Sequence, residues 1–244
     1  MNLSGKQVTF RHSRSRSDPY RVLILLGVLL AGLFLLRAFE TKEVESPFTA
    51  TAIPTRTAES FAREGETHFN AGDLNKAIEA YRQAVALDPE NAQLWAELAR
   101  IQTYSSALLT TDAEKYIRLQ EALDSINQGL EIDPDSSTVH AVRAFVLDWL
   151  ANPALVGEEW TTLLTESEQE AIHALALDNQ NTLALAYYAE ILIDGQQLIQ
   201  AEQYIGQALE RDPGLMDVHR VNGYVRESLG YYGDAIRAYQ QAVE

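Results

Sequence analysis

The sequence contains no cysteine, and it has few basic residues beyond its first quarter. Without thiols the chain cannot form disulfides, iron–sulfur clusters or cysteine-ligated zinc sites, and it cannot use thiol catalysis. Residues 58–244 hold 11 Lys and Arg against 31 Asp and Glu, a formal net charge of −20. A body this acidic repels a phosphate backbone, so we expect no binding to nucleic acid.

The sequence also lacks the motifs that support catalysis. It has no HExxH pair, no glycine-rich phosphate loop and no G-x-S-x-G turn. None of its histidines pairs with a carboxylate at a metal-binding spacing, so we interpret them as surface or interface residues; they are His12, His68, His140, His173 and His219. We therefore expect no enzyme, no metal, no cofactor and no small-molecule substrate.

The longest apolar run covers residues 22–36 and has no polar side chain. Extended to residues 20–39, it is long enough to cross a hydrocarbon core of about 30 Å, with Arg21 and Arg37 reaching toward the two interfaces. A cleaved signal peptide has the same basic start and apolar stretch. The only small-x-small site, residues 50–52, lies well beyond the run, which favours an uncleaved transmembrane helix over residues 20–39.

The charges beside this run predict its orientation. Only Arg37 and Lys42 follow it closely, whereas the basic residues that precede its apolar part are Lys6, Arg11, Arg14, Arg16 and Arg21. By the positive-inside rule, residues 1–19 form a basic cytoplasmic tail. Residues 40–57, which contain two prolines and five threonines after position 40, read as a flexible linker. The acidic body is then expected on the outer side of the cytoplasmic membrane.

That body repeats one short phrase, in which an amphipathic helix end is followed by aspartate and usually proline. The four copies occupy residues 84–91, 129–136, 174–181 and 208–215, and a fifth breaks off at residues 242–244. Because proline cannot continue a helix, each phrase marks a helix end. Successive copies are separated by 45, 45 and 34 residues.

A period of 34 residues with two helices per period resembles the tetratricopeptide repeat family. In the first repeat, Gly65, Ala77, Tyr81, Ala84 and Pro89 occupy the spacing of that family. The resemblance implies an all-α fold of antiparallel helix pairs stacked into a right-handed superhelical solenoid, whose first helices line a concave groove. We number the repeats 1 to 5 in chain order; they cover residues 58–91, 92–136, 137–181, 182–215 and the incomplete 216–244.

Repeats 2 and 3 are each eleven residues longer than the pattern, which is almost three helical turns. We therefore expect longer helices there. Thr111 with Glu114, and Thr165 with Glu168, have the spacing of capping boxes and predict that a helix restarts at each.

The best-known groove of this family, in chaperone adaptors, holds a terminal carboxylate with basic and amide side chains. The corresponding positions of this chain are Ala62, Glu66, Glu97, Thr138 and Val142. None is basic and two are acidic, so a carboxylate is repelled. The chaperone-adaptor mode of binding is therefore not expected.

A different groove is predicted in the middle of the solenoid. Val142, Phe145 and Trp149 share one helical face, and Tyr187 and Tyr224 are expected on comparable faces of the next repeats. The surrounding acids are Glu66, Glu97, Asp148 and Glu190. Such a groove suits an extended or helical peptide with apolar anchors and some Lys or Arg. The alternative is that this apolar stripe belongs to the core.

A second candidate surface is the last helix, which ends the repeats without a polar cap. Ile236, Tyr239 and Val243 leave apolar area exposed there unless something covers it. The sequence leaves three explanations open: a dimer contact, a docked partner, or a longer chain of which this is a part.

These features predict a protein that works by binding other proteins. We expect a membrane-anchored scaffold or assembly factor for a membrane or envelope complex, with protein partners or their peptide segments. The alternative is a holdase-type accessory chaperone beside the secretion machinery, and a third possibility is a non-catalytic regulator of an enzyme partner. A scaffold has one stoichiometric partner set, whereas a chaperone has many weak clients.

Overall fold

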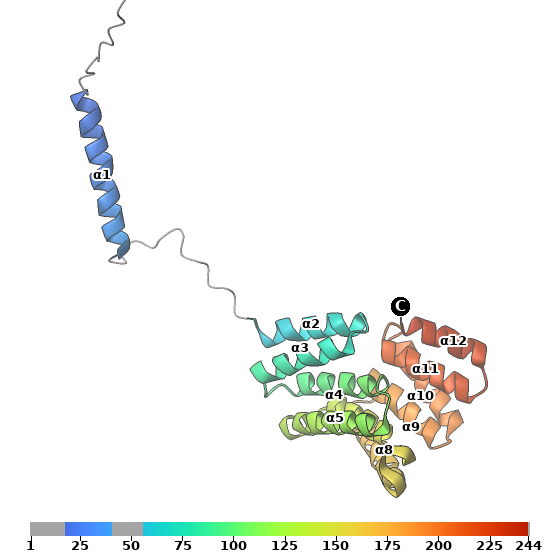
Figure 1. The fold of residues 1–244 in the computed structure, drawn as a ribbon. Helices are drawn as coiled ribbons and strands as arrows, with labels where there is room; N and C mark the ends of the chain where they lie inside the picture. The colour runs from blue at the N-terminus through green and yellow to red at the C-terminus, as the bar shows by residue number, and fades with distance from the viewer. Residues whose placement is uncertain (1–17, 41–55, 244) are drawn as a thin grey trace, which may run out of the picture. The chain divides into compact units, whose positions relative to one another are not determined.

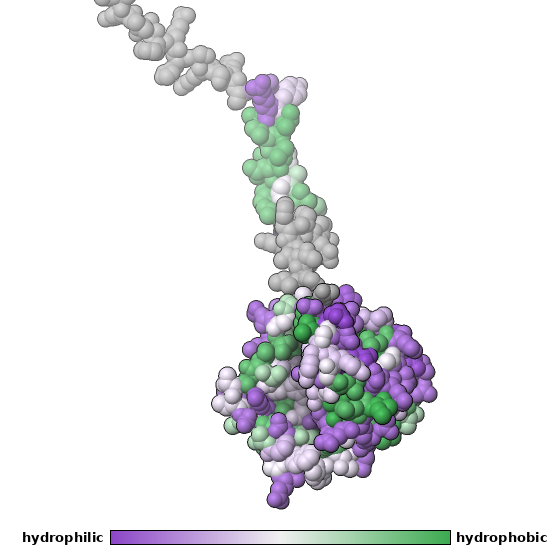
Figure 2. Space-filling model, turned by 90° about the vertical axis from the view of Figure 1, so that its right-hand side faces the viewer, coloured by the Kyte–Doolittle hydropathy of each residue, from purple (hydrophilic) through white to green (hydrophobic). Residues whose placement is uncertain are grey.

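The computed structural model describes residues 18–40 and 56–243, which fall into two separate units. In the first unit, α1 (Pro19–Glu40) is a single helix, and Figure 2 shows its surface as almost wholly hydrophobic. Among the described residues it is the one helix long and apolar enough to cross a membrane, over Pro19–Arg37. Most of the expected tail and linker lies outside the described residues.

The second unit consists of helices only, with no strand among its described residues, as the all-α prediction requires. Consecutive helices pack as antiparallel pairs, and the pairs stack on one another in a curved array (Figure 1). In chain order the helices are α2 (Ala58–Asn70), α3 (Leu74–Leu87), α4 (Ala92–Ser106), α5 (Asp112–Ile132), α6 (Ser137–Leu150), α7 (Pro153–Val156), the 3₁₀ turn η1 (Gly157–Glu159), α8 (Trp160–Leu177), α9 (Thr182–Asp194), α10 (Leu198–Arg211), α11 (Met216–Ser228) and α12 (Tyr232–Gln241).

The repeated phrase starts helices as well as ending them. Its last residue is the N-cap of the next repeat's first helix: Asn91, Ser136 and Asn181 each accept a hydrogen bond from the backbone N–H three residues on. Such caps satisfy donors that a helix N-terminus leaves unpaired. In the fourth phrase Leu215 takes this place, so α11 begins without a side-chain acceptor.

The phrase is tied to the next helix by a second contact that recurs in three repeats. The side chain six residues after the proline of the phrase is a Trp or a His, and its ring nitrogen forms a hydrogen bond with the proline carbonyl oxygen. The pairs are Trp95 with Pro89 at 2.9 Å, His140 with Pro134 at 2.8 Å, and His219 with Pro213 at 2.6 Å. Two of the five histidines therefore hold the turns between repeats.

The two insertions are absorbed differently. In repeat 2, α5 reaches 21 residues and starts with the predicted capping box: Thr111 Oγ1 accepts from the Glu114 N–H, and the Glu114 carboxylate accepts from the Thr111 N–H. In repeat 3 the predicted restart at Thr165 is wrong. Thr165 lies inside α8, where its hydroxyl donates to the Thr161 carbonyl, because the helix already begins at Trp160 after α7 and η1.

Within each pair, side-chain sizes are matched across the two helices. A Cβ on Gly65 would lie 2.5 Å from the Tyr81 ring, and a Cβ on Gly223 would lie 2.5 Å from the Tyr239 ring. In repeat 4, Ala189 stands where those glycines stand, and its partner is the smaller Ile205 in the same core cluster. A glycine is therefore required where the second helix presents a tyrosine.

This matching predicts that Gly65→Ala lowers the free energy of unfolding by about 1–3 kcal/mol through overpacking. The double variant Gly65→Ala/Tyr81→Ile copies the pair in repeat 4 and should regain part of that loss. Gly206→Ala is the control, since that helical glycine has no atom within 4 Å of an added Cβ, and it should be neutral or stabilising. Urea unfolding measures all three, and equal destabilisation by both single variants would contradict the packing argument.

Candidate functional site

The concave face of the solenoid is closed by a buried carboxylate on α11. Asp217 is fully buried and accepts hydrogen bonds from the Tyr104 and Tyr187 hydroxyls, both at 2.5 Å, and from Arg100 at 2.8 Å. Burial raises the pKa of both tyrosine hydroxyls, which keeps them protonated as donors. These contacts join α4 of repeat 2 and α9 of repeat 4 to α11 of repeat 5.

Beside Asp217, a second basic side chain crosses the same face. Arg220 donates both terminal nitrogens to the Glu190 carboxylate and its Nε to the Tyr104 hydroxyl, the latter at 3.1 Å. Its guanidinium also lies 5.3 Å from the Phe145 ring centroid and 5.8 Å from that of Trp149. At this range a desolvated cation is attracted to an aromatic face.

The predicted central groove is therefore filled rather than open. Val142, Phe145 and Tyr187 are buried, and the Phe145 and Tyr187 rings stack at 4.3 Å between centroids. Glu190 is buried as well, held by Arg220 and by the Trp149 indole N–H at 3.2 Å. These four residues are core, which corrects the expectation that they face a partner: the superhelix curls until repeat 5 covers them.

The other predicted groove residues lie in two places. Glu66 is exposed on α2 and, with Glu97, lines a second cleft of about 450 Å³ that also contains Asp217. Glu97 pairs with Arg100 at 2.7 Å and so belongs to the network that closes the face. Trp149 and Tyr224 are half-buried and line a cleft. Sequence analysis did not predict a role for Arg100 or Arg220. The available signal was the scarcity of basic residues in the acidic body, because each one has many possible carboxylate partners.

At the last helix, the three predicted residues separate. Ile236 and Val243 are exposed, at 60% and 86% of their surface. Tyr239 instead turns inward: its ring packs on Gly223, and its hydroxyl donates to Glu227 at 2.9 Å. Tyr239 is therefore not part of an apolar end face.

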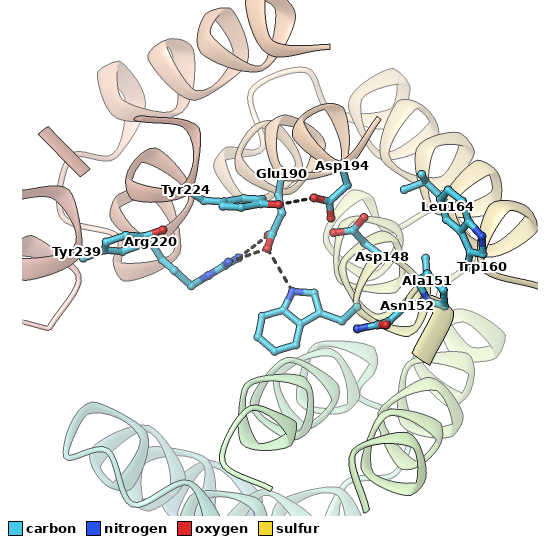
Figure 3. Close-up of a pocket in the computed structure, with 12 residues that line it drawn as sticks. Asp148, Ala151, Asn152, Trp160, Leu164, Glu190, Asp194, Arg220, Tyr224 and Tyr239 are labelled. Atoms are coloured by element: carbon cyan, nitrogen blue, oxygen red, sulfur yellow. Dashed lines mark hydrogen bonds and ion pairs between the residues drawn. The ribbon is translucent and has the colours of Figure 1, made fainter. Parts of the chain in front are cut away.

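A cleft of about 610 Å³ lies at the junction of repeats 3, 4 and 5 (Figure 3). Its lining comes from α6, α7, α8, α9, α11 and α12, and from the turn before α7. The lining residues are Asp148, Trp149, Ala151, Asn152, Pro153, Trp160, Leu164, Glu190, Asp194, Arg220, Tyr224 and Tyr239. We call it the α6–α9–α11 cleft.

Three carboxylates meet in this cleft, and only one of them is neutralised by a cation. Arg220 pairs with Glu190, whereas Asp194 accepts a hydrogen bond from the Tyr224 hydroxyl at 2.5 Å. Burial, reinforced by Asp194 and Glu190, raises the pKa of Asp148 well above its usual range. Burial also raises the pKa of Asp194, although the Tyr224 hydrogen bond opposes this. The cleft can therefore accept a positive charge or hold a proton.

The described residues contain no group of three His, Cys, Asp or Glu side chains arranged to hold a metal ion. The carboxylates of the cleft can accept hydrogen bonds from a neutral donor or from an organic cation. Such sites recognise side chains of a partner.

Comparison with known proteins identifies the architecture. Residues 65–103 match the family model for the TPR, or tetratricopeptide, repeat. The helix pairs superpose on a thermophilic TPR protein of Thermus thermophilus with a TM-score of 0.61 and 16% identity, covering 77% of this chain and 90% of that one. Residues 58–241 form a TPR solenoid. The resemblance predicted from the spacing of small residues is confirmed.

Two further solved structures are similar to this chain at lower TM-scores. Pseudomonas aeruginosa pilF has a TM-score of 0.46 at 15% identity, covering 76% of this chain and 74% of that chain. MamA of Desulfovibrio magneticus RS-1 has a TM-score of 0.43 at 10% identity, covering 76% and 92%. No curated protein matches the sequence.

The closing network predicts that Asp217→Asn destabilises the solenoid by about 1–3 kcal/mol, because buried Arg100 loses one of its two carboxylate partners and keeps only Glu97. Asp124→Asn removes an equal charge from an exposed position on α5 and should change stability little. Urea unfolding with helicity as the signal measures both. Equal stability of the two variants would show that the closure contributes nothing.

The raised pKa of Asp148 predicts a pH-dependent effect of Asp148→Asn. Between the unfolded pKa, near 3.8, and the raised folded value, the native state binds a proton that the unfolded chain has released. Wild-type stability therefore falls as pH rises through this window, and an amide avoids that loss. The variant should match wild type near pH 4 and be more stable near pH 8, and a difference that does not grow with pH would contradict the burial argument.

Proposed function

We propose that this TPR protein is a membrane-anchored scaffold or assembly factor that holds a protein partner in the α6–α9–α11 cleft. The observation that carries the proposal is the closure of the concave face by Asp217 and Arg220. With the central groove filled, this cleft is a concave feature that combines aromatic walls with two carboxylates that no cation neutralises. TPR solenoids act by binding proteins, and a concave apolar site with a few placed polar groups is the usual form of a binding site.

Attachment to a membrane is the second part of the proposal. Two features support α1 as the membrane-spanning segment. It is apolar over Pro19–Arg37, and basic residues precede it. The charge asymmetry favours an N-terminus in the cytoplasm and an acidic solenoid on the outer side. An anchor confines the solenoid to a shell beside the membrane, which raises its effective concentration for membrane or envelope partners.

The scaffold is favoured over the holdase-type chaperone by the character of the concave face. Promiscuous binding of unfolded clients relies on adaptable apolar surface. Here the aromatic residues of that face are locked by hydrogen bonds and ring stacking, and the open cleft is charged. A few placed charges suit one specific partner better than many unrelated ones.

Partner recovery tests the function. Trp160→Ala removes a half-buried aromatic from the cleft wall, whereas Ile117→Ala removes an exposed apolar side chain from α5. After gentle detergent extraction of the tagged full chain, we expect one partner set at fixed stoichiometry with wild type and Ile117→Ala, and at least about tenfold less with Trp160→Ala. A broad, substoichiometric spread of exported proteins would instead support the chaperone.

Protease accessibility tests the topology separately. Protease added to the outside of spheroplasts is expected to digest the solenoid, and protease added to inverted vesicles is expected to leave it intact. The reverse pattern would contradict the proposed orientation without bearing on what the cleft binds.

A further inference from the structure

The structure contains one buried acid that lacks a partner. Among the described residues three acids are buried, namely Asp148, Glu190 and Asp217. Asp217 accepts three hydrogen bonds, and Glu190 is bound by Arg220 and Trp149. Asp148 is only 6% exposed, and its Oδ1 has no hydrogen-bond partner among the described residues. A buried carboxylate without a hydrogen-bond donor destabilises the folded state, and a bound group that supplies a donor relieves this destabilisation.

This carboxylate lies in the wall of the α6–α9–α11 cleft. In Figure 3 the Asp148 carboxylate, on α6, and the Asp194 carboxylate, on α9, point toward one another. Three carboxylates and one guanidinium give the cleft a formal charge of −2. Arg220 is fixed by both its terminal nitrogens on Glu190, so the uncompensated charge belongs to Asp148 and Asp194.

The remaining walls are aromatic and aliphatic. Trp160 and Leu164 come from α8, in the insertion of repeat 3, and Tyr224 comes from α11. The Tyr224 hydroxyl donates to Asp194, which fixes that carboxylate at the edge of the cleft. Flat apolar walls beside two acids suit a cation that is planar, weakly hydrated and carried on an aliphatic stem.

We propose that the cleft binds an arginine side chain of the protein partner, with its guanidinium held between Asp148 and Asp194. The inference rests on the proposed function, because it names the part of the partner that the scaffold holds. Arginine is favoured over lysine since its planar fork donates in two directions, as two carboxylates on different helices require, and since it stacks on aromatic rings.

Proton release accompanies this binding. Apart from Asp148 itself, the charged or titratable groups that line the cleft are Glu190 and Asp194 from α9, Arg220 and Tyr224 from α11, and Tyr239 from α12; the lining residues of α7 and α8 are uncharged. Burial raises the pKa of Asp148 and of Asp194, so the empty cleft retains a proton at pH values where an exposed aspartate is ionised. A guanidinium favours both ionised forms. Affinity for arginine is therefore expected to increase with pH.

The test uses the full chain in detergent and the short peptide acetyl-Ala-Arg-Ala-amide as probe. Two matched peptides carry citrulline, which keeps the shape but not the charge, or lysine. Binding is followed by calorimetry and by tryptophan fluorescence, since Trp149 and Trp160 both line the cleft. Asp148→Asn and Asp194→Asn are the test variants, and Asp124→Asn is the control for loss of one negative charge on an exposed surface.

The wild-type chain and Asp124→Asn should bind the arginine peptide saturably. Each cleft variant, and the citrulline peptide on wild type, should bind at least about tenfold more weakly, as the loss of a charged hydrogen bond implies. Equal affinity for citrulline, affinity for lysine equal to that for arginine, or unchanged binding by both cleft variants would overturn the proposal.

The same variants separate this inference from the scaffold function. If partner recovery from membranes is unchanged in Asp148→Asn and Asp194→Asn, the chain is still a scaffold but the arginine site is refuted. If wild type recovers no stoichiometric partner, the scaffold function itself is refuted, whatever the peptide shows.

Discussion

The structure of the solenoid depends on one buried carboxylate. Asp217 lies on the first helix of repeat 5, yet its hydrogen-bond donors come from repeats 2 and 4. A TPR array normally makes contacts only between neighbouring repeats, so its curvature follows from many small rotations. Here a side-chain network spans the concave face and fixes that curvature. The aromatic residues beneath it become core, and one cleft stays open at the junction of α6, α9 and α11.

This closure explains which parts of the molecule the sequence could predict. Helix positions followed from the repeated phrase, because a helix end, a proline and a capping side chain are local features that each repeat carries with it. The insertion in repeat 2 was predictable for the same reason, since the capping box at Thr111 is local. The capping box predicted at Thr165 was wrong. The chain turns earlier, at α7 and η1, and α8 begins at Trp160, so Thr165 lies inside that helix.

The site was harder to predict because it depends on contacts between distant residues. Arg100 and Asp217 are 117 positions apart, and no period in the sequence relates them. Val142, Phe145 and Trp149 were assigned to one face of a helix. Such an apolar face is found both in a binding groove and in a core, and only the position of repeat 5 decides between the two. Trp149 and Tyr224 remain at the cleft. Of the two acids that give it chemistry, Asp148 was among the acids expected around the groove, and Asp194 lies one helical turn after the predicted Glu190.

Docking of a partner in the α6–α9–α11 cleft is the central claim, and photo-crosslinking in cells tests it most directly. A photoreactive amino acid is placed at Trp160, inside the cleft, or at Glu66, which is exposed on α2. We expect a discrete crosslinked product from position 160 and none from position 66. A product from position 66 alone would contradict the claim, because the partner would then be held at the cleft that Glu66 lines with Glu97 and Asp217.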